Sequence, residues 1–370
     1  MANAALMKRN NRLSILRAVR EGDISRAELA RRTGLTRAAV TILVDELIEE
    51  KLLTEGESIL SDKGRRPTLL SLERSARASV GIDLSREGIR LAVSDLGMNI
   101  SEDIYIDLIS SREETVTEIV GAIESLMRRY NILGVGIISP GPVDVGCGRI
   151  LEPTGLDKWH GFEVKELCER LGIPTFIERD TRAIAIAERG VDPKKQSFIS
   201  ILADHGLGGA FVWEGRIFGS REGFGCEIGH VCLDPSGEEC SCGARGCAEL
   251  YASIPAVMRR ATALGYPSWE ELVSSTDDTA RKLLIDMADA LSHALVCAVN
   301  LLEPREIILS GMLSVTAPIL KERIEDRLSR TAFTAAGRSV TVCASALGDS
   351  ARARAAAGVV IQKYFDGDLA

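Results

Sequence analysis

The hydrophobic pattern of residues 10–53 predicts three short helices. One covers residues 10–19, a second is RAELARRT after Ser25, and a third is RAAVTILVDELIEEKLL after Thr36. Serine and threonine are typical helix N-caps, because their side-chain oxygens accept hydrogen bonds from the first free backbone N–H groups. Apolar residues three and four apart give the third helix one buried face, formed by Val40, Leu43, Val44 and Leu47.

A short turn containing Gly34 separates the second and third helices, which is the arrangement of a helix-turn-helix unit. In such units the first turn of the second helix enters the DNA major groove. A basic segment, KGRRP, and a strand, TLLSL, follow and predict a wing whose tip reaches phosphates or the minor groove. The alternative is a three-helix interaction module with no role in DNA binding. We predict a winged helix-turn-helix DNA-binding domain at residues 1–72, with contacts from Ser25, Thr36, Arg37, Ala38, Thr41, Lys63, Arg65 and Arg66.

From residue 79 onward the pattern is that of an α/β body. Two groups of strands and helices follow one another in a similar order, strand-rich first and then helical, so we place one lobe at residues 79–190 and a second at 191–370. Strands are predicted at 80–84, 89–94, 133–138, 175–178, 198–202, 306–309 and 340–344, and helices at 114–129, 164–171, from 181, at 277–302 and at 351–364.

The composition is that of an aliphatic globular protein. With 370 residues, 45% apolar and 4% aromatic, the chain has room for two or three domains. No apolar run reaches the length needed to span a bilayer, and the first twenty residues contain no signal-peptide core. We therefore expect a cytoplasmic protein without membrane contact. Nine cysteines, three of them in one cluster and the others scattered singly, fit a reducing compartment.

Charge is distributed unevenly along the chain. Residues 1–70 contain 13 Lys or Arg against 10 Asp or Glu, whereas the rest contains 32 against 43, within a net charge of −8. A basic N-terminal part on an acidic body indicates that only the N-terminal part meets nucleic acid.

Residues 222–251, EGFGCEIGHVCLDPSGEECSCGARGCAELY, concentrate potential metal ligands. Three thiols and an imidazole are the ligand set of a closed tetrahedral zinc site, whose binding energy folds a glycine-rich loop that cannot pack alone. The alternatives are reduced thiols in a loop or, less in keeping with a reducing compartment, disulfides. Cys232 could replace the histidine as fourth ligand. We predict a structural Zn²⁺ site formed by His230, Cys240, Cys242 and Cys247.

The run GCEIGH followed by CSCGARGCAE resembles the signature of the ROK family, named for repressors, an open reading frame and kinases. The resemblance spans roughly residues 79–364. It implies a two-lobed, duplicated actin-like ATPase fold with a cleft, found in sugar kinases and sugar-responsive transcription regulators. The N-terminal domain resembles the winged helix of ROK repressors, and GRRP matches their wing motif. Because plain sugar kinases of the family begin near Ser79, the resemblance indicates the regulator branch, similar to xylose repressors.

Two turns that carry ATP phosphates in the ROK kinases are altered here. The first, DxGGT in the kinases, reads DLSREG at residues 83–88, and the second, GTGxGGG in the kinases, reads DHGLGG at 204–209. In the first turn, Ser85 and Arg86 block close backbone approach and Glu87 repels phosphate oxygens. Asp204 adds a further negative charge in the second turn. We therefore do not expect ATP to bind productively.

The resemblance also implies a sugar pocket. The turn PGPVD at residues 140–144, which borders this pocket in the family, is intact. Asp180 matches the kinases' catalytic base, which takes the proton from the sugar hydroxyl, while Arg179 stands where they have Asn. The alternative for Asp180 is an ordinary helix N-cap, and Arg179 raises the hypothesis of an anionic ligand. The predicted sugar-binding residues are Gly141, Arg179, Asp180, Glu227, His230 and Glu249.

Together these features predict a sugar-responsive DNA-binding regulator, a repressor of carbohydrate genes, that binds operator DNA and a monosaccharide or its derivative. Paired half-sites on DNA imply a homodimer or homotetramer. One alternative is an ATP-dependent sugar kinase with Asp180 as catalytic residue, which the two altered turns oppose. The other is a ligand-free dimerisation scaffold with a purely structural zinc.

Overall fold

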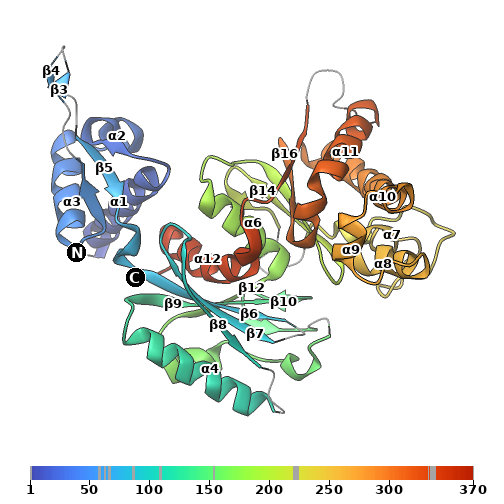
Figure 1. The fold of residues 1–370 in the computed structure, drawn as a ribbon. Helices are drawn as coiled ribbons and strands as arrows, with labels where there is room; N and C mark the ends of the chain where they lie inside the picture. The colour runs from blue at the N-terminus through green and yellow to red at the C-terminus, as the bar shows by residue number, and fades with distance from the viewer. Residues whose placement is uncertain are drawn as a thin grey trace.

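The computed structural model describes residues 2–56, 60–61, 64–65, 68–85, 88–107, 111–152, 155–219, 225–331, 333 and 339–369. A small N-terminal domain lies beside a body made of two lobes, each built on its own five-stranded sheet (Figure 1).

The N-terminal domain contains helices α1 (Ala2–Arg20), α2 (Arg26–Thr33) and α3 (Arg37–Glu49), and a sheet of strands β1 (Ile24–Ser25), β5 (Leu69–Leu72) and β2 (Leu53–Glu55) in the order β1-β5-β2. Both predicted N-caps are confirmed. The Ser25 hydroxyl accepts from the Glu28 N–H at 3.3 Å, and the Thr36 hydroxyl accepts from the Ala39 N–H at 3.2 Å. The predicted apolar stripe of α3 is buried, so the three helices share one core.

Two helix boundaries differ from the prediction. The first helix is longer and begins at Ala2. The third ends at Glu49 rather than continuing to Leu53, because Lys51 takes a positive φ of 58° and Leu53 then pairs with Leu72 across the sheet. The chain between β2 and β5 carries the short antiparallel pair β3 (Leu60–Ser61) and β4 (Gly64–Arg65), which projects from the domain as the wing (Figure 1).

The first lobe is built on a sheet of order β12-β9-β6-β7-β8. Strands β6, β7 and β8 form an antiparallel meander, and β9 and β12 add to it in parallel. Helix α4 (Arg112–Met127) shares the apolar core on one face of this sheet. The strand bounds are β6 Ala78–Leu84, β7 Ile89–Asp95, β8 Ile100–Ile106, β9 Ile132–Ser139 and β12 Thr175–Arg179; β10 (Val143–Asp144), β11 (Arg149–Ile150) and α5 (Lys165–Leu171) lie between β9 and β12 in the chain.

The second lobe repeats this plan. Its sheet has the order β15-β14-β13-β16-β17, again a meander followed by two parallel strands. The repeated order is the duplicated architecture that the resemblance implied. Strand bounds are β13 Phe198–Ala203, β14 Leu207–Trp213, β15 Arg216–Ile217, β16 Glu306–Ser310 and β17 Thr341–Ala344; helix bounds are α7 Glu249–Ala252, α8 Ile254–Ala263, α9 Trp269–Ser274, α10 Asp278–Leu302 and α11 Ala317–Thr331.

Helix α10 is long and apolar enough to cross a membrane by length and composition, which we did not expect from the sequence. Half of its apolar window is buried inside the second lobe, where it packs against α11 and the sheet core. The core helix of a globular lobe has this same character, and its buried face explains the apolar sequence.

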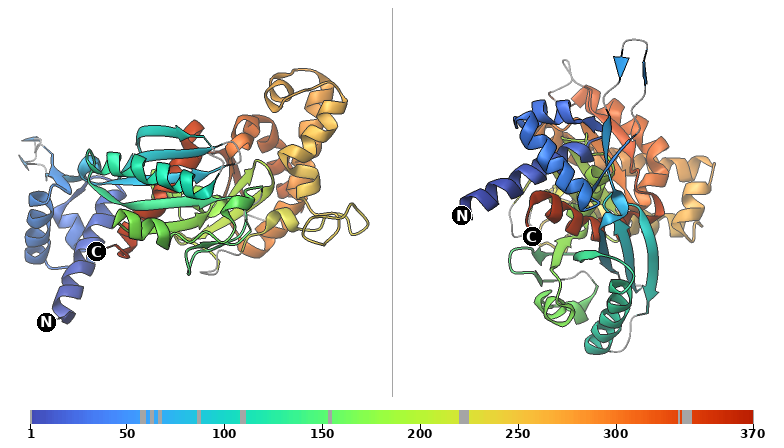
Figure 2. Two further views of the ribbon diagram at one scale, coloured as in Figure 1. Left: turned by 90° about the horizontal axis from the view of Figure 1, so that it is seen from below. Right: turned by 90° about the vertical axis from the view of Figure 1, so that its left-hand side faces the viewer.

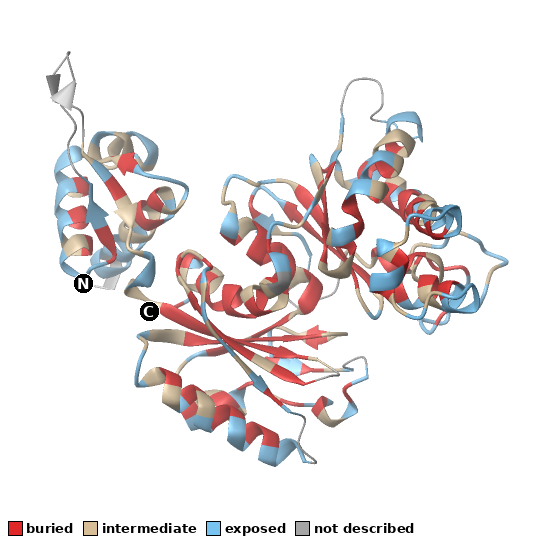
Figure 3. Cartoon of the chain, viewed as in Figure 1, coloured by how far each residue is buried: buried red, intermediate tan, exposed pale blue. Residues whose placement is uncertain are grey.

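The C-terminal helix α12 (Ala351–Asp366) follows the second lobe in sequence but lies on the first sheet, between that sheet and α6 (Asp180–Val191) (Figures 1 and 2). Our boundary at residue 191 had assigned this helix to the second lobe. Its small side chains allow very close packing: a Cβ on Gly81 would lie 2.4 Å from the Ala357 nitrogen, and one on Gly136 would lie 2.1 Å from the Ala356 oxygen. Helix α12 and the central strands are therefore mostly buried (Figure 3).

Candidate functional site

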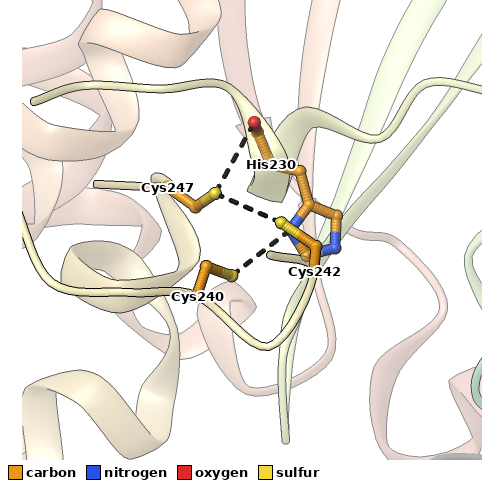
Figure 4. Close-up of side chains that lie close together, drawn as sticks. All are labelled: His230, Cys240, Cys242 and Cys247. Atoms are coloured by element: carbon orange, nitrogen blue, oxygen red, sulfur yellow. Dashed lines mark hydrogen bonds between the residues drawn. The ribbon is translucent and has the colours of Figure 1, made fainter. Parts of the chain in front are cut away.

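Four side chains meet in the second lobe as a group that could hold a metal ion. His230, Cys240, Cys242 and Cys247 place their ligand atoms within 4.8 Å of one another (Figure 4). The His230 Nδ1 lies 3.7 Å from the Cys240 Sγ, and the Cys242 Sγ lies 3.6 Å from the Cys247 Sγ. A tetrahedral zinc with metal–sulfur bonds of about 2.3 Å requires ligand atoms roughly 3.8 Å apart. The spacing of these four atoms therefore fits a tetrahedral metal.

Local backbone turns bring the four residues together. His230 ends the short 3-10 helix η3 (Ile228–His230), and the loop then folds back so that the Leu233 N–H donates to the Gly246 carbonyl at 2.7 Å. Gly246 has a φ of 64°, and a Cβ there would lie 1.8 Å from the Asp234 oxygen, so this position requires glycine. Cys232, which we considered as an alternative ligand, is exposed and lies outside the group of four.

The thiols must lose their protons before they can bind a metal. Burial, together with the neighbouring Cys242 and Cys240, raises the pKa of Cys247 to about 12. A thiol with such a pKa is protonated at neutral pH, whereas metal binding displaces the proton and compensates the thiolate charge.

The residue after this loop links the candidate metal site to the interlobe region. Glu249 begins α7 two residues beyond Cys247, and its Oε2 accepts a hydrogen bond from the Leu207 N–H at 2.9 Å. Leu207 lies within the glycine-rich turn at residues 204–209, where β14 begins. The orientation of the Glu249 carboxylate is thereby fixed between the metal loop and this turn.

The glycines of that turn are explained by packing. A Cβ on Gly206 would lie 2.7 Å from the Glu249 Oε2, and a Cβ on Gly208 would lie 2.6 Å from the Thr181 side chain. Close approach of protein side chains therefore accounts for both glycines, without a bound phosphate.

The described part of the first altered turn is closed on itself. The Ser85 N–H and hydroxyl both donate to the Gly88 carbonyl, at 3.1 and 2.8 Å, and the Gly88 N–H donates back to the Ser85 hydroxyl at 3.2 Å. These N–H groups are already used inside the turn. Arg86 and Glu87, on which part of our prediction for this turn depended, lie outside the described residues.

Arg179 and Glu227 form an ion pair between the lobes. Arg179 is the last residue of β12 in the first lobe, and Glu227 precedes His230 in the loop of the second lobe that carries the candidate metal group. Both guanidinium Nη atoms contact the carboxylate, with the Nη2–Oε2 distance at 3.0 Å. Burial opposes the charge on Arg179, but Glu227 outweighs it and raises the arginine pKa. The buried Nε of Arg179 has no hydrogen-bond partner among the described residues, so it remains able to donate to a ligand.

Asp180 lies at the first turn of α6 and is 8% exposed. It is not the helix N-cap that we weighed as an alternative, because that position belongs to Arg179, whose side chain caps nothing. The Asp180 Oδ2 instead accepts from the Nη1 of Arg352, at 3.3 Å. Arg352 comes from the first turn of α12.

Arg352 is the centre of a cluster of three carboxylates. It donates to both oxygens of Asp83 at 2.8 to 3.1 Å, and its Nη1 lies 3.6 Å from the Asp204 Oδ2. Asp83 is on β6, Asp180 on α6, and Asp204 follows β13 of the second lobe. Burial opposes the Arg352 charge, but the three carboxylates outweigh it and raise its pKa. Burial raises the pKa of Asp204, and Arg352 offsets that increase only in part.

Sequence reasoning missed Arg352 as part of the site. Asp83 and Asp204 had been placed in the two altered turns, with Asp204 as an added negative charge, and the structure brings both of them to one guanidinium. The available signal was a pair of arginines, Arg352 and Arg354, within an otherwise small and apolar segment, ARARAAAGVV. A charge in such a helix implies a buried partner, but not which one.

Of the other predicted sugar-site residues, Gly141 lies in the turn after β9 with a φ of 81°, a conformation that favours glycine. His230 contributes its ring to the candidate metal group, so its two predicted roles fall on one imidazole. The described site therefore joins Arg179 to Glu227, Asp180 to Arg352, and Glu249 to the glycine-rich turn.

The predicted DNA-contact residues of α3 share an exposed face. Thr36, Arg37, Ala38 and Thr41 are all exposed at its first turns, opposite the buried stripe. Ser25 is half-buried and caps α2, as Thr36 caps α3. At the wing tip, Lys63 and Arg66 lie outside the described residues, and only the backbone of Arg65 is described, in β4.

Comparisons with known proteins match both parts of the chain. Residues 79–363 match the ROK family, and residues 7–63 match the MarR family. The chain is 28% identical over 372 residues to the xylose repressor of Bacillus subtilis (strain 168), covering 97% of this chain and 96% of that repressor. It is 27% identical over 372 residues to the DNA-binding transcriptional dual regulator NagC of Escherichia coli (strain K12), covering 94% and 91%.

A solved structure, of a ROK family transcriptional regulator described as a homolog of the E. coli MLC protein, matches with a TM-score of 0.82. The match covers 98% of this chain and 97% of the regulator's chain. The sequence identity is 24%, so this likeness shows the fold alone. The matched segments correspond to the N-terminal domain and the two-lobed body.

Proposed function

The chain belongs to the ROK family, and on this premise we propose that it is a sugar-responsive DNA-binding transcriptional regulator that represses carbohydrate genes. The observation that carries the proposal is the union, in one chain, of a helix-turn-helix domain with an exposed α3 face and a ROK body. The matched relatives that are repressors and regulators have the same two parts over more than nine-tenths of their length.

The proposed sugar site lies between the lobes, at Arg179, Asp180, Glu227, Glu249, the His230 ring and the Gly141 turn. Carboxylates suit such a site because each one accepts hydrogen bonds from two neighbouring hydroxyls. The unused buried Nε of Arg179 supports a ligand here. Because Glu227 already compensates the charge of Arg179, we rank neutral sugars above the anionic ligand considered from the sequence.

We further propose that the metal is a structural zinc and that ATP is not used. His230, Cys240, Cys242 and Cys247 would hold the zinc, which would stiffen the loop that carries Glu227 and precedes Glu249. The Arg352 guanidinium within the carboxylate cluster and the self-closed Ser85 turn support a body without a nucleotide. The protein would act in the cytoplasm as a homodimer or homotetramer, with its paired α3 helices on two operator half-sites.

The test is DNA binding by the full-length protein at physiological salt. Genomic fragments are selected by repeated gel shift, and binding of the selected fragment is then measured with and without D-xylose, other neutral monosaccharides, amino sugars and sugar phosphates. The proposal predicts specific binding and a change of affinity with at least one sugar. Absence of any specific complex at that salt would end it.

A sugar kinase is the second candidate, because Asp180 stands at the matching helix start in the body. A coupled assay of ATP consumption against hexoses and amino sugars decides it. Turnover that Asp180→Asn abolishes would establish the kinase. The ligand-free dimerisation scaffold would instead be supported if the protein binds DNA with the same affinity in the presence and absence of every sugar, and if calorimetry detects no heat of sugar binding.

A further inference from the structure

The two ends of helix α12 lie at different functional parts of the molecule. Its first turn carries Arg352 into the interlobe carboxylate cluster, and its last turn lies against α1 of the DNA-binding domain (Figure 2). At about 1.5 Å per residue, the helix spans roughly 20 Å between these contacts.

The contact with α1 is specific. Arginines of α1 donate to backbone carbonyls at and just beyond the end of α12: the Arg17 Nε reaches the Phe365 oxygen at 2.6 Å, and Arg9 reaches the Gly367 and Leu369 oxygens, the latter at 3.1 Å. The Arg20 guanidinium lies 4.3 Å from the centre of the Phe365 ring. The Phe365 carbonyl is one of the last four of the helix, which have no partner within it, so Arg17 caps the C-terminus of α12, and Arg9 binds the chain that follows.

An apolar core continues across this contact. Ile15, Leu16 and Val19 of α1 belong to the same buried cluster as Ile361 and Phe365 of α12. The DNA-binding domain is therefore packed on α12. Since α12 is in turn locked to the first sheet by its close contacts with Gly81 and Gly136, this helix joins the domain to the first lobe.

At the other end, the second lobe contacts this helix through Asp204. The two Arg352 contacts to first-lobe residues, Asp83 and Asp180, are hydrogen bonds, whereas the Arg352–Asp204 separation of 3.6 Å is a longer ion pair. One nitrogen, Nη1, is shared between Asp180 and Asp204. A ligand hydroxyl that donates to Asp180 would compete with Nη1 for that carboxylate and leave Nη1 to Asp204.

We propose that α12 couples the sugar site to the DNA-binding domain, with Arg352 as the positioning residue that senses the ligand. When Asp180 accepts from a sugar, Arg352 pairs more fully with Asp204 and draws the second lobe toward the body that carries the DNA-binding domain. In a dimer this movement changes the separation of the two α3 helices, on which half-site recognition depends. This inference rests on the proposed function and names its route of regulation.

The first experiment needs neither sugar nor DNA. Hydrogen exchange is measured on the full-length protein and on Arg352→Met, with the segments 9–20 and 361–369 as readout and the distant α4 (Arg112–Met127) as internal reference. Coupling predicts exchange about threefold faster or more at the α1–α12 contact relative to α4. The control is Arg323→Met, which removes an arginine that donates to Asp289 at 2.7 and 2.8 Å within the second lobe.

Unchanged exchange at the α1–α12 contact in Arg352→Met overturns the proposal, as does the same change in Arg323→Met or a uniform change in every segment. If Arg352→Met does not fold, Asp204→Asn takes its place, since it removes only the second-lobe contact and keeps Arg352 with Asp83.

The second experiment uses Arg17→Gln, which alters the α1 contact far from the sugar site. With the sugar that changes wild-type DNA affinity, calorimetry should give an unchanged sugar Kd, while the sugar-induced change in DNA affinity falls about fivefold or more. If sugar changes the DNA affinity of Arg17→Gln as much as that of the wild type, the proposed coupling through α12 is wrong. A wild type that responds to none of the sugars tested counts against the proposed function, and hydrogen exchange still decides the coupling.

Discussion

The candidate metal group and the Arg352 cluster differ in how the chain assembles them. The four candidate metal ligands lie between positions 230 and 247 and are brought together by turns of one loop. The Arg352 cluster draws on positions 83, 180, 204 and 352, from two sheets and two helices. The geometry of a local loop is set by its own turns and, as we propose, by a bound metal, whereas that of a cluster spanning the lobes depends on how the lobes are placed. The first is therefore suited to fixing side chains, and the second to reporting a movement.

Removing the metal should have the largest effect. Structural zinc sites contribute about 10 kcal/mol or more of apparent binding energy, so Cys240→Ser with Cys242→Ser should unfold the loop and lower Tm by about 10 °C or more. Elemental analysis for bound zinc and differential scanning calorimetry provide the measurement. Cys147→Ser, an exposed thiol outside the group, is the control. Metal-free protein with an unchanged Tm would refute the structural role.

Loss of Arg352 should be the next largest effect. Arg352→Met leaves Asp83 and Asp180 buried without their cation, and breaking a buried pair in this way costs about 3–5 kcal/mol. Urea unfolding checks this value. Adding Asp83→Asn should recover part of the loss, because it removes one uncompensated charge. Arg323→Met, at a more exposed pair, should cost about 1 kcal/mol or less. An equal loss of unfolding free energy in Arg352→Met and Arg323→Met would show that the Arg352 cluster stabilises the fold no more than an exposed ion pair does.

The predicted DNA-binding surface of α3, like the candidate metal group, is formed by residues that lie close together in the sequence. Arg37→Ala should weaken specific DNA binding by about 1–3 kcal/mol, since it removes a cation from the exposed first turn of α3. Fluorescence anisotropy against the selected fragment measures it. Arg330→Ala, an exposed arginine on α11 of the second lobe, is the charge-matched control and should leave the affinity unchanged. An equal loss in both variants would indicate a nonspecific charge effect.

The smallest expected effect concerns pH. Burial raises the pKa of Asp204 above its ordinary value of 3.8, so the folded protein binds this proton more tightly than the unfolded chain. The resulting stability is fully present below the unfolded pKa and is lost as pH rises through the folded pKa. Asp204→Asn should therefore flatten the fall of Tm with rising pH in that acid range and shift Tm at neutral pH by about 4 °C or less. Thermal unfolding between about pH 4 and pH 8 tests this, and an unaltered pH profile would contradict it.

The features predicted well from the sequence are those set by neighbouring residues. Ser25 and Thr36 cap helices because a hydroxyl can reach an N–H three residues ahead, and short hydrophobic runs located most strands of both sheets. The metal group was predicted for the same reason. The end of α3 was misjudged because residues 50–53 continue a helical pattern, while pairing of Leu53 with Leu72 favours a strand.

What the sequence could not give depends on packing across long separations. Helix α12 can pack on the first sheet because Gly81 and Gly136 have no side chains. This role can be recognised only once Ala356 and Ala357 are seen to lie against them. Likewise, the partners of Arg352 are 148 to 269 positions away, and no spacing rule connects them. Such contacts form only after both sheets and their crossovers are in place.

The central claim, that sugar binding in the body changes DNA binding by the N-terminal domain, is tested most directly by one titration. The Kd of the full-length protein for its selected genomic fragment is measured by anisotropy at physiological salt, in the presence and absence of D-xylose and each further sugar of the panel. The account predicts a change of about fivefold or more with at least one sugar, and no such change for an Asp180→Asn variant that still binds the fragment. An affinity for DNA that no sugar alters would contradict it.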